Sequence, residues 1–293
     1  MRAVYRSFAK VNLYLAVCGR RADGFHEIDT AMQTVDLCDR LVCTASSDGE
    51  LSVACAHPEV PPGAGNLVYR ALDLLRAAAG RPRAGMRVEI EKRIPLAAGL
   101  GGGSGNAACA LVAANRLWQL DWPQARLEPL AAEIGADVTF FLRGGTQRGR
   151  GRGERVTPLP ALPDSRWVIV KPSYGLETGA VYRRASVSLT SSEAKIRMAL
   201  DLLAKRDLPG LAAAMFNDLA SAAEQMRAEL GEVRAWMTTH RVKGAMLTGS
   251  GSALFGLIHD PGSTAAMENE GRARGWDVVQ VRPTRVGCIE EEA

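Results

Sequence analysis

The feature that most constrains this chain is a glycine-rich segment placed between a predicted strand and a predicted helix. Five of the seven residues in 99–105 are glycine. Because glycine has no Cβ, main-chain amides there can approach an anion closely and the chain can turn through positive φ. The following helix adds unpaired N–H groups and the positive end of its dipole. A flexible linker is the alternative, but an amphipathic helix rarely follows a linker at once, so the segment predicts a phosphate-binding loop.

The segment matches neither of two common nucleotide-binding fingerprints. It lacks the Gly-Lys-Ser/Thr ending of a Walker A loop. A G-x-G-x-x-G spacing starts at Gly99, but the only acidic residue near the expected ribose position is Asp121, in a predicted turn. A second glycine-rich run, 248–252, is weaker evidence because small residues also form ordinary turns. Two such segments in one chain favour a phosphorylated ligand.

Composition sets the broad class. The 293 residues are 47% apolar and 23% charged, with a net charge of +4, which indicates a globular protein of two domains or one large one. That charge suits anionic substrates and is low for a nucleic-acid binder. The chain shows no signal-peptide layout and no apolar run of the length that spans a bilayer. The six cysteines lack framework spacing, so we expect reduced thiols and a cytoplasmic protein.

Local patterns predict mixed strands and helices without a regular βαβ alternation, and therefore an α+β fold. In the strand at 8–17, Lys10 and Asn12 share a face. We expect a hairpin from 41–45 and 51–55. Residues 143–156 are too rich in glycine and arginine to pack as an element, and the run 148–155 is expected to be a solvated loop or a hairpin tip. Asn66 and Gly80 are plausible caps of one helix. Further strands are predicted at 86–92, 167–171 and 278–282, and helices at 66–80, 105–118, 124–134, 192–205 and 208–231.

Several segments carry a resemblance to a known family. PLAAGLGGGSGNAA, at 95–108, resembles the central motif of the GHMP small-molecule kinases. AKVNLYLAV, RADGFHEIDTAMQTVDLCD, NLVYRA, IGADVTFFL, FNDL and MLTGSGSALFGL occur in the order typical of one branch of that family. The resemblance extends from about residue 8 to residue 256. It implies a two-domain fold of mixed sheets with helices packed on them and the active site in the cleft between domains. The ATP-binding domain would be 1–158, and 159–293 would contribute to the substrate site.

The triple glycine before Ser104 and the DGFHE segment are typical of that branch. The resemblance therefore implies a transferase that moves the γ-phosphoryl of ATP to the 2-hydroxyl of a methylerythritol carrying cytidine diphosphate. This is a step of the non-mevalonate isoprenoid pathway. Mg²⁺ would arrive with ATP, since no residues have metal-ligand spacing. The resemblance implies no nucleic-acid or membrane partner, and a monomer or weak homodimer.

The resemblance assigns two catalytic residues. Asp137, in GADV, would accept the proton of the substrate hydroxyl, and Lys10 would orient Asp137 and neutralise the moving phosphoryl group. The residues alone leave other interpretations open. Asp137 could cap the backbone after Gly135, and Lys10 could be a surface lysine on a strand.

The sequence departs from the family pattern at three positions. Gly105 and Thr248 stand where serine is usual, and Phe25 stands where tyrosine is usual.

The remaining implied site residues form two groups. Phe25 and Tyr182 would stack on cytosine and His26 would read its edge, while helix capping explains Asn66 equally well. The nucleotide group is Asn66, Pro95, Gly99, Leu100, Gly101, Gly102, Gly103, Ser104, Gly105 and Asn106, and the substrate group is Asn12, Phe25, His26, Thr178 and Tyr182.

Two other functions compete with this one. A different GHMP kinase would act on homoserine, a mevalonate-pathway alcohol or a sugar, and would not need a base sandwich. A nucleic-acid-binding module could use the arginine-rich run 148–155, but that run lacks interleaved aromatic residues. A steep salt dependence with oligonucleotides would identify such a module.

Overall fold

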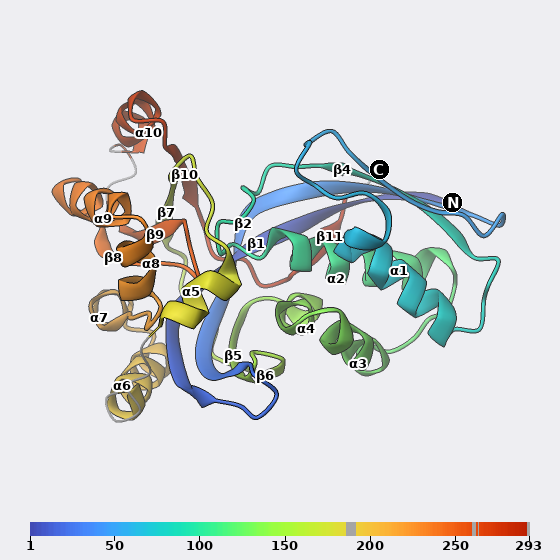
Figure 1. Cartoon of the computed structure of the whole chain (residues 1–293), viewed down its shortest axis with the longest axis horizontal. Coiled ribbons are helices and arrows are strands. Elements are labelled where there is room, and N and C mark those ends of the chain that lie inside the picture. Colours follow the sequence, from blue (N-terminus) through green and yellow to red (C-terminus); the bar gives the residue numbers. More distant parts are fainter. Residues whose placement is uncertain (186–191, 260–261, 263, 292–293) are drawn as a thin grey trace.

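The computed structural model describes residues 1–185, 192–259, 262 and 264–291. Two sheets, each with its own helices, lie side by side and meet near the middle of the molecule (Figure 1). This confirms the predicted α+β class. The boundary at residue 158 stays a prediction. No helix in these ranges is long and apolar enough to cross a membrane.

The first sheet is built on one long antiparallel pair, β1 (Arg2–Arg20) and β2 (His26–Ser46). The other members flank this pair in the order β11-β1-β2-β4-β3, with β5 on β2 and β6 on β5. The last strand thus returns from the far end of the chain to the first sheet. These strands are β3 (Leu51–Cys55), β4 (Gly85–Glu91), β5 (Thr146–Gly151), β6 (Arg155–Pro158) and β11 (Cys288–Glu290).

Four helices cover one face of the first sheet (Figure 1). They are α1 (Leu67–Ala78), α2 (Gly102–Leu117), α3 (Gln124–Ile134) and α4 (Ala136–Arg143), and a short 3-10 turn, η1 (Gly63–Gly65), precedes α1. Most of α2 is buried, and its alanines let it pack closely against β1 and α1. The predicted cap holds, since the Asn66 side chain accepts a hydrogen bond from the amide of Val68.

The second sheet has the order β10-β7-β9-β8. Its strands are β7 (Arg166–Lys171), β8 (Lys243–Leu247), β9 (Leu254–Ile258) and β10 (Asp277–Val281). Both faces are buried. Val168 and Val170 of β7 lie in one apolar cluster with Met237, and Trp167 and Ile169 lie in another that contains residues of β1 and of the helices between residues 192 and 214. Its helices are α5 (Thr178–Arg184), α6 (Ser192–Lys205), α7 (Leu208–Ala214), α8 (Ala220–Met226), α9 (Glu229–Thr239) and α10 (Thr264–Ala273).

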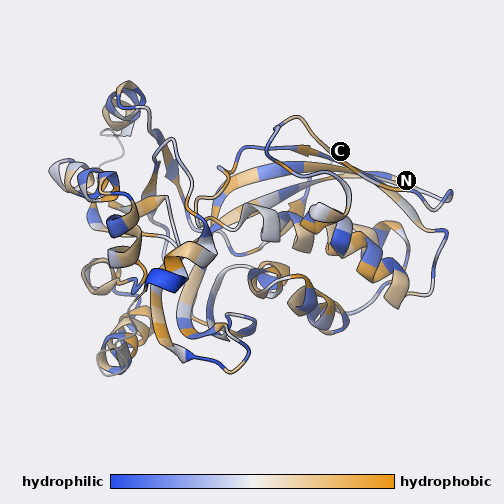
Figure 2. Cartoon of the chain, in the orientation of Figure 1, coloured by the Kyte–Doolittle hydropathy of each residue, from blue (hydrophilic) through white to orange (hydrophobic). Residues whose placement is uncertain are grey.

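β1 ends and β2 begins beside the second unit (Figure 1), and this part of the two strands is largely hydrophobic (Figure 2). Leu15 of β1 donates its amide to the carbonyl of Phe216 and accepts from the amide of Asp218. The amide of Val17 donates to the Asp218 carboxylate. One strand therefore contributes side chains to both cores, and residues on it lie where the two units meet.

The predicted hairpin of 41–45 with 51–55 is wrong. β3 runs parallel to β4, with Leu51 opposite Met86, and β4 lies between β2 and β3. The Asp48 carboxylate accepts from the Ser46 hydroxyl and the Glu50 amide, so the chain does turn there. However, the turn does not place β3 beside β2. β4, which follows the crossover through α1, occupies the position between β2 and β3.

Three other local predictions need correction. Residues 143–156 do pack as structure, since they include β5 and the start of β6, an antiparallel pair whose turn is the predicted hairpin tip within 148–155. The predicted helix at 208–231 is broken, because the backbone around Phe216 leaves helical geometry to pair with β1. The helix after the glycine segment begins at Gly102, three residues earlier than predicted, and α4 was not foreseen.

Candidate active site

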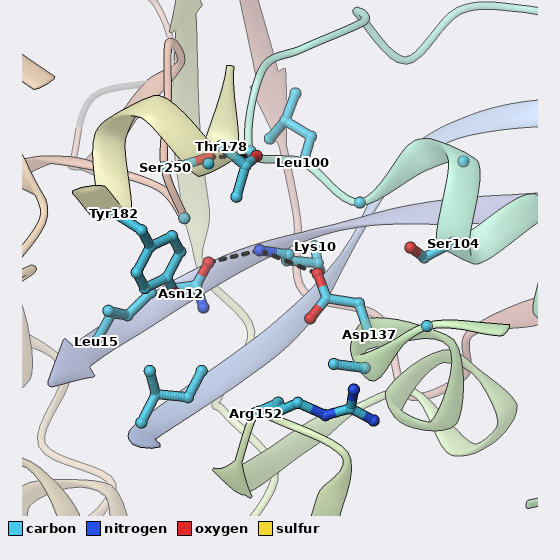
Figure 3. Close-up of a pocket in the computed structure, with 18 of the residues that line it drawn as sticks. Lys10, Asn12, Leu15, Leu100, Ser104, Asp137, Arg152, Thr178, Tyr182 and Ser250 are labelled. Carbon is cyan, nitrogen blue, oxygen red and sulfur yellow. Dashed lines mark hydrogen bonds and ion pairs between the residues drawn. The ribbon is translucent and has the colours of Figure 1, made fainter. Parts of the chain in front are cut away.

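A cavity of about 1180 Å³ lies where the two units meet. The glycine-rich segment, β1, the turn after β1, the start of α4, the start of α5 and the second glycine-rich run form its walls (Figure 3). The structure brings most of the predicted site residues together here. They are Lys10, Asn12, Phe25, His26, Pro95, Gly99, Leu100, Gly101, Gly102, Gly103, Ser104, Asp137, Thr178 and Tyr182.

The glycine-rich segment turns sharply before α2 begins. Gly99 and Gly101 have φ of 74° and 71°, in the left-handed region that favours glycine. A Cβ on Gly99 would collide with the Thr248 carbonyl, and one on Gly101 would lie 2.7 Å from the Phe141 ring. Gly101 is the N-cap of α2 and no side chain caps the first turn. The positive end of the α2 dipole therefore faces the cavity at Gly102–Gly103.

The second glycine-rich run packs against the back of the first. The amides of Ser252 and Ala253 donate to the carbonyls of Ala97 and Ala98. The Asn217 side chain donates to the carbonyls of Leu247 and Gly249, at 2.9 and 2.8 Å. The amides of Ser252 and Ala253 are therefore hydrogen-bonded to the residues just before the first segment. The second run thus supports the loop that faces the cavity.

Lys10 and Asp137 meet at the centre of the cavity (Figure 3). The Lys10 ammonium lies 3.8 Å from a carboxylate oxygen of Asp137 and donates a 2.6 Å hydrogen bond to the amide oxygen of Asn12. Lys10 is 3% exposed, so the surface-lysine interpretation is wrong. Asp137 lies in the first turn of α4, whose N-cap is Gly135, a residue without a side chain that could cap the helix. The Asp137 side chain keeps 36% of its surface exposed.

The charge state of Lys10 depends on this neighbour. Burial lowers the pKa of Lys10, because the charged form loses its hydration, and the Asp137 carboxylate acts in the opposite direction. A cation thus lies beside a carboxylate that solvent and substrate can reach, next to a helix N-terminus. This arrangement can bind anions and stabilise charge that moves between them.

Asn12 is fixed from three sides. Its side-chain amide donates to the Thr30 hydroxyl at 2.9 Å, its oxygen accepts from Lys10, and its main-chain amide donates to the Thr248 hydroxyl at 3.1 Å. Thr30 in turn donates to the Tyr14 carbonyl. This network sets the position of the Lys10 ammonium, and it shows that Thr248, where the family usually has serine, supplies its hydroxyl within the protein.

The other end of the cavity carries rings and cations. The rings of His26 and Tyr182 lie 5.1 Å apart, and the Arg152 guanidinium lies 5.1 Å from the centre of the Phe25 ring. Phe25 is 54% exposed. Burial, with a smaller contribution from Arg20, lowers the pKa of His26. A neutral imidazole offers one donor and one acceptor, the combination needed to read the edge of a base.

Sequence reasoning missed several residues of the cavity wall. Arg152 lies at the tip of the β5–β6 hairpin, one of the two forms predicted for its run, but that prediction did not place it at the cavity. Ser250 lies 2.9 Å from the Thr178 hydroxyl, oxygen to oxygen, and joins the second glycine-rich run to α5. Thr30 and Lys92 also line the wall. Alternation along β2 could have indicated Thr30, but the pattern gives no sign of the other three.

Three predicted nucleotide-site residues lie outside the cavity wall. Asn66 caps α1 and donates to the Pro61 carbonyl. Gly105 faces β1, where a Cβ would lie 3.0 Å from both the Phe8 carbonyl and the Ser7 hydroxyl. Asn106 is buried and donates to Asp39. A serine at position 105 would therefore point into the protein, so its replacement by glycine removes no hydroxyl from the cavity.

Among the residues that the structure describes, no group of three or more His, Cys, Asp or Glu side chains could hold a metal ion. Glu133 and Asp137 are the acidic side chains on the cavity wall.

Comparison with known proteins gives the family. Residues 66–145 match the GHMP kinase N-terminal domain, and residues 199–275 match the GHMP kinase C-terminal domain. The 4-diphosphocytidyl-2-C-methyl-D-erythritol kinase of Pelotomaculum thermopropionicum is 42% identical over 252 residues, which cover 86% of this chain and 88% of that protein. The enzyme of the same name from Geobacter sulfurreducens is 35% identical, covering 94% and 96% of the two chains.

Solved structures agree. A crystal structure of 4-(cytidine 5′-diphospho)-2C-methyl-D-erythritol kinase superposes with a TM-score of 0.78 at 36% identity, covering 97% of this chain and 99% of that one. A homoserine kinase from Cytophaga hutchinsonii reaches a TM-score of 0.81 at 20% identity, covering 99% and 97%, and supports the fold alone.

The fold and the glycine-rich cavity, together with these matches, define a small-molecule kinase of the GHMP class. Within that class, the chain belongs to the 4-diphosphocytidyl-2-C-methyl-D-erythritol kinase family.

Proposed function

We propose that this chain transfers the γ-phosphoryl group of ATP to the 2-hydroxyl of 4-diphosphocytidyl-2-C-methyl-D-erythritol, a step of the non-mevalonate isoprenoid pathway. The observation that carries the proposal is the contact of Lys10 with Asp137, 3.8 Å apart, between the glycine-rich segment and the ring-lined end of one cavity. The family relationship supports the identity of the substrate. We also expect a cytoplasmic enzyme, monomeric or weakly dimeric.

Asp137 is proposed to accept the proton of the 2-hydroxyl. Its carboxylate is partly exposed, whereas the Lys10 ammonium behind it is buried and held by Asn12. In phosphoryl transfer the protein mainly positions the reactants and stabilises charge. Lys10 would orient the carboxylate and neutralise the charge that develops on the transferring group.

The two substrates are proposed to enter from opposite ends of the cavity. The main-chain amides of the glycine-rich segment and the α2 N-terminus would bind the triphosphate, with Ser104 at the same wall. Phe25 and Tyr182 would hold the cytosine ring, with His26 and Arg152 near its edge. Thr178 would contact the substrate beside Ser250.

Mg²⁺ is proposed to arrive with ATP and to be held mainly by phosphate oxygens. Two acidic side chains, Glu133 and Asp137, line the cavity, which fits an ion that has few protein ligands. When bound, such an ion neutralises phosphate charge during transfer.

The experiment is an ADP-release assay that offers the cytidine diphosphate substrate, homoserine and mevalonate separately. We expect turnover of the first alone. Turnover of homoserine or mevalonate at an equal kcat/KM would contradict the proposed substrate and favour another GHMP kinase activity. Product analysis by ³¹P NMR would locate the new phosphate, which we expect on the 2-hydroxyl.

A further inference from the structure

One buried carboxylate connects both ends of the glycine-rich segment. Asp39, on β2, is 0% exposed and lies outside the cavity. One of its oxygens accepts from the amides of Arg93 and Ile94, both at 2.8 Å, just before the segment. The other accepts from the Asn106 side chain at 2.9 Å, just after it, and from the Lys92 ammonium at 2.7 Å. Asp39, Lys92 and Asn106 are called the Asp39 cluster below.

Lys92 adds a second constraint to this cluster. Its ammonium also donates to the Ile94 carbonyl, and it lies 3.0 Å from the position that a Cβ would take on Gly102. A cation so close to a helix N-terminus is unfavourable by itself, because the helix dipole is positive there. The buried carboxylate of Asp39 offsets this repulsion and keeps Lys92 at the first turn of α2.

We propose that Asp39 is a positioning residue for nucleotide binding. By joining Ile94 to Asn106, it fixes the two ends of the segment, so that the amides between them stay directed into the cavity. The segment needs such an external support because it is rich in glycine and has few side chains whose packing could hold its shape. The inference rests on the proposed function, since it assumes that ATP binds at this segment.

The test is the variant Asp39→Asn. An asparagine can still accept from the amides of Arg93 and Ile94, but it presents an N–H group to Lys92 and Asn106, which are both donors. Removing one partner of a buried charge pair leaves the other uncompensated, so we expect the KM for ATP to rise about tenfold or more. The KM for the cytidine diphosphate substrate should stay within about twofold, because that end of the cavity is built by other elements.

A swapped pair provides the rescue. In Asp39→Asn with Asn106→Asp, the new amide donates to the new carboxylate, and Lys92 again lies near a negative charge. We expect the KM for ATP to return to within about threefold of wild type. If the swap binds ATP no better than Asp39→Asn alone, the joining of the two ends is not what matters, and the inference is wrong.

Asp29→Asn is the matched control. Asp29 is a buried carboxylate on the same strand, bound by the Tyr14 hydroxyl at 2.8 Å and by Arg148 at 2.9 Å. We expect it to lower the melting temperature as Asp39→Asn does, while the KM for ATP stays within about twofold. An equal rise in the ATP KM of both variants would reduce the effect to general destabilisation and overturn the inference.

Asn106→Ala keeps the test decisive if Asp39→Asn fails to fold. It removes only the link to α2 and leaves three donors on Asp39. We expect its ATP KM to rise about threefold with an unchanged KM for the second substrate. A wild-type ATP KM in Asn106→Ala, or in a folded Asp39→Asn, overturns the inference alone, whereas an inactive wild-type protein overturns the proposed function.

Discussion

The ammonium of Lys10 and the carboxylate of Asp137 lie 3.8 Å apart but differ in exposure, at 4% and 36% of their side-chain surface. β1 supplies the lysine from the interior of the protein, and α4 supplies the aspartate from the cavity wall. The carboxylate is therefore the member of the pair that a substrate hydroxyl can reach. The buried cation acts from behind it.

The substitution Asp137→Asn tests the proposed base. It removes the proton acceptor and keeps the size of the side chain, so kcat should fall about 10²–10⁴-fold. Binding of both substrates, measured by titration calorimetry, should change little because neither glycine segment nor ring-lined end is altered. Wild-type turnover in this variant would show that Asp137 is not the base.

The pH dependence of kcat/KM tests the role of Lys10. A lysine is charged below its pKa, and burial lowers the pKa of Lys10 from its ordinary value of 10.5. Activity that needs the cation is present at lower pH and is lost as pH rises through this lowered pKa. In the kcat/KM profile, which reports the free enzyme, activity should therefore be lost at a pH below 10.5.

Asp137 also sets where this high-pH limb falls, since its negative charge favours the charged lysine. In the residual activity of Asp137→Asn, we expect the limb to move to lower pH. A limb that stays in place, or moves to higher pH, would show that the titrating group is not Lys10.

The substitutions Gly99→Ala and Gly103→Ala separate backbone geometry from glycine content. Gly99 has φ of 74° and a Cβ there would strike Thr248, whereas a Cβ on Gly103 would meet only Leu67, at 3.7 Å. We expect Gly99→Ala to lose about 1–3 kcal/mol of unfolding free energy and most of its ATP affinity. Gly103→Ala should keep the wild-type free energy of unfolding or raise it by up to about 1 kcal/mol.

Urea unfolding and nucleotide titration measure both effects. Equal losses of stability in the two variants would mean that the turn at Gly99 carries no special constraint. A Gly99→Ala protein that binds ATP as wild type does would argue against the loop geometry described above.

The substitution Phe25→Ala tests the base sandwich. Phe25 is 54% exposed, so its loss should leave the melting temperature unchanged. Stacking of a base on an aromatic ring contributes about 1–3 kcal/mol, and the KM for the cytidine diphosphate substrate should rise about tenfold. Phe25→Tyr keeps the ring and serves as the control. If Phe25→Ala leaves that KM unchanged, the ring does not stack on cytosine.

Local signals in the sequence predicted much of the fold. Alternation predicted β4 and the middle of β1, and the cap Asn66 predicted the start of α1, because each pattern depends on neighbouring residues. Pairing was harder. β3 joins β4 rather than β2, and the break before α8 exists because Phe216 pairs with β1. Contacts between distant segments decide both.

The candidate site shows the same division. Glycine spacing predicted the loop before α2, since that property is local. Lys10 is buried because β1, a strand of the first sheet, packs against the second sheet. No pattern around Lys10 reveals this contact. Arg152 reaches the cavity only because an arginine-rich run folds into the β5–β6 turn. The family resemblance supplied the roles that local patterns left open.

The proposed reaction depends most on where the nucleotide binds. A crystal structure with a non-hydrolysable ATP analogue and the cytidine diphosphate substrate would test it directly. We expect the triphosphate on the amides of the glycine-rich segment, with the γ-phosphate beside Lys10 and the 2-hydroxyl within hydrogen-bond distance of Asp137. A triphosphate bound elsewhere, with that segment empty and Asp137 far from the substrate hydroxyl, would contradict the proposed mechanism.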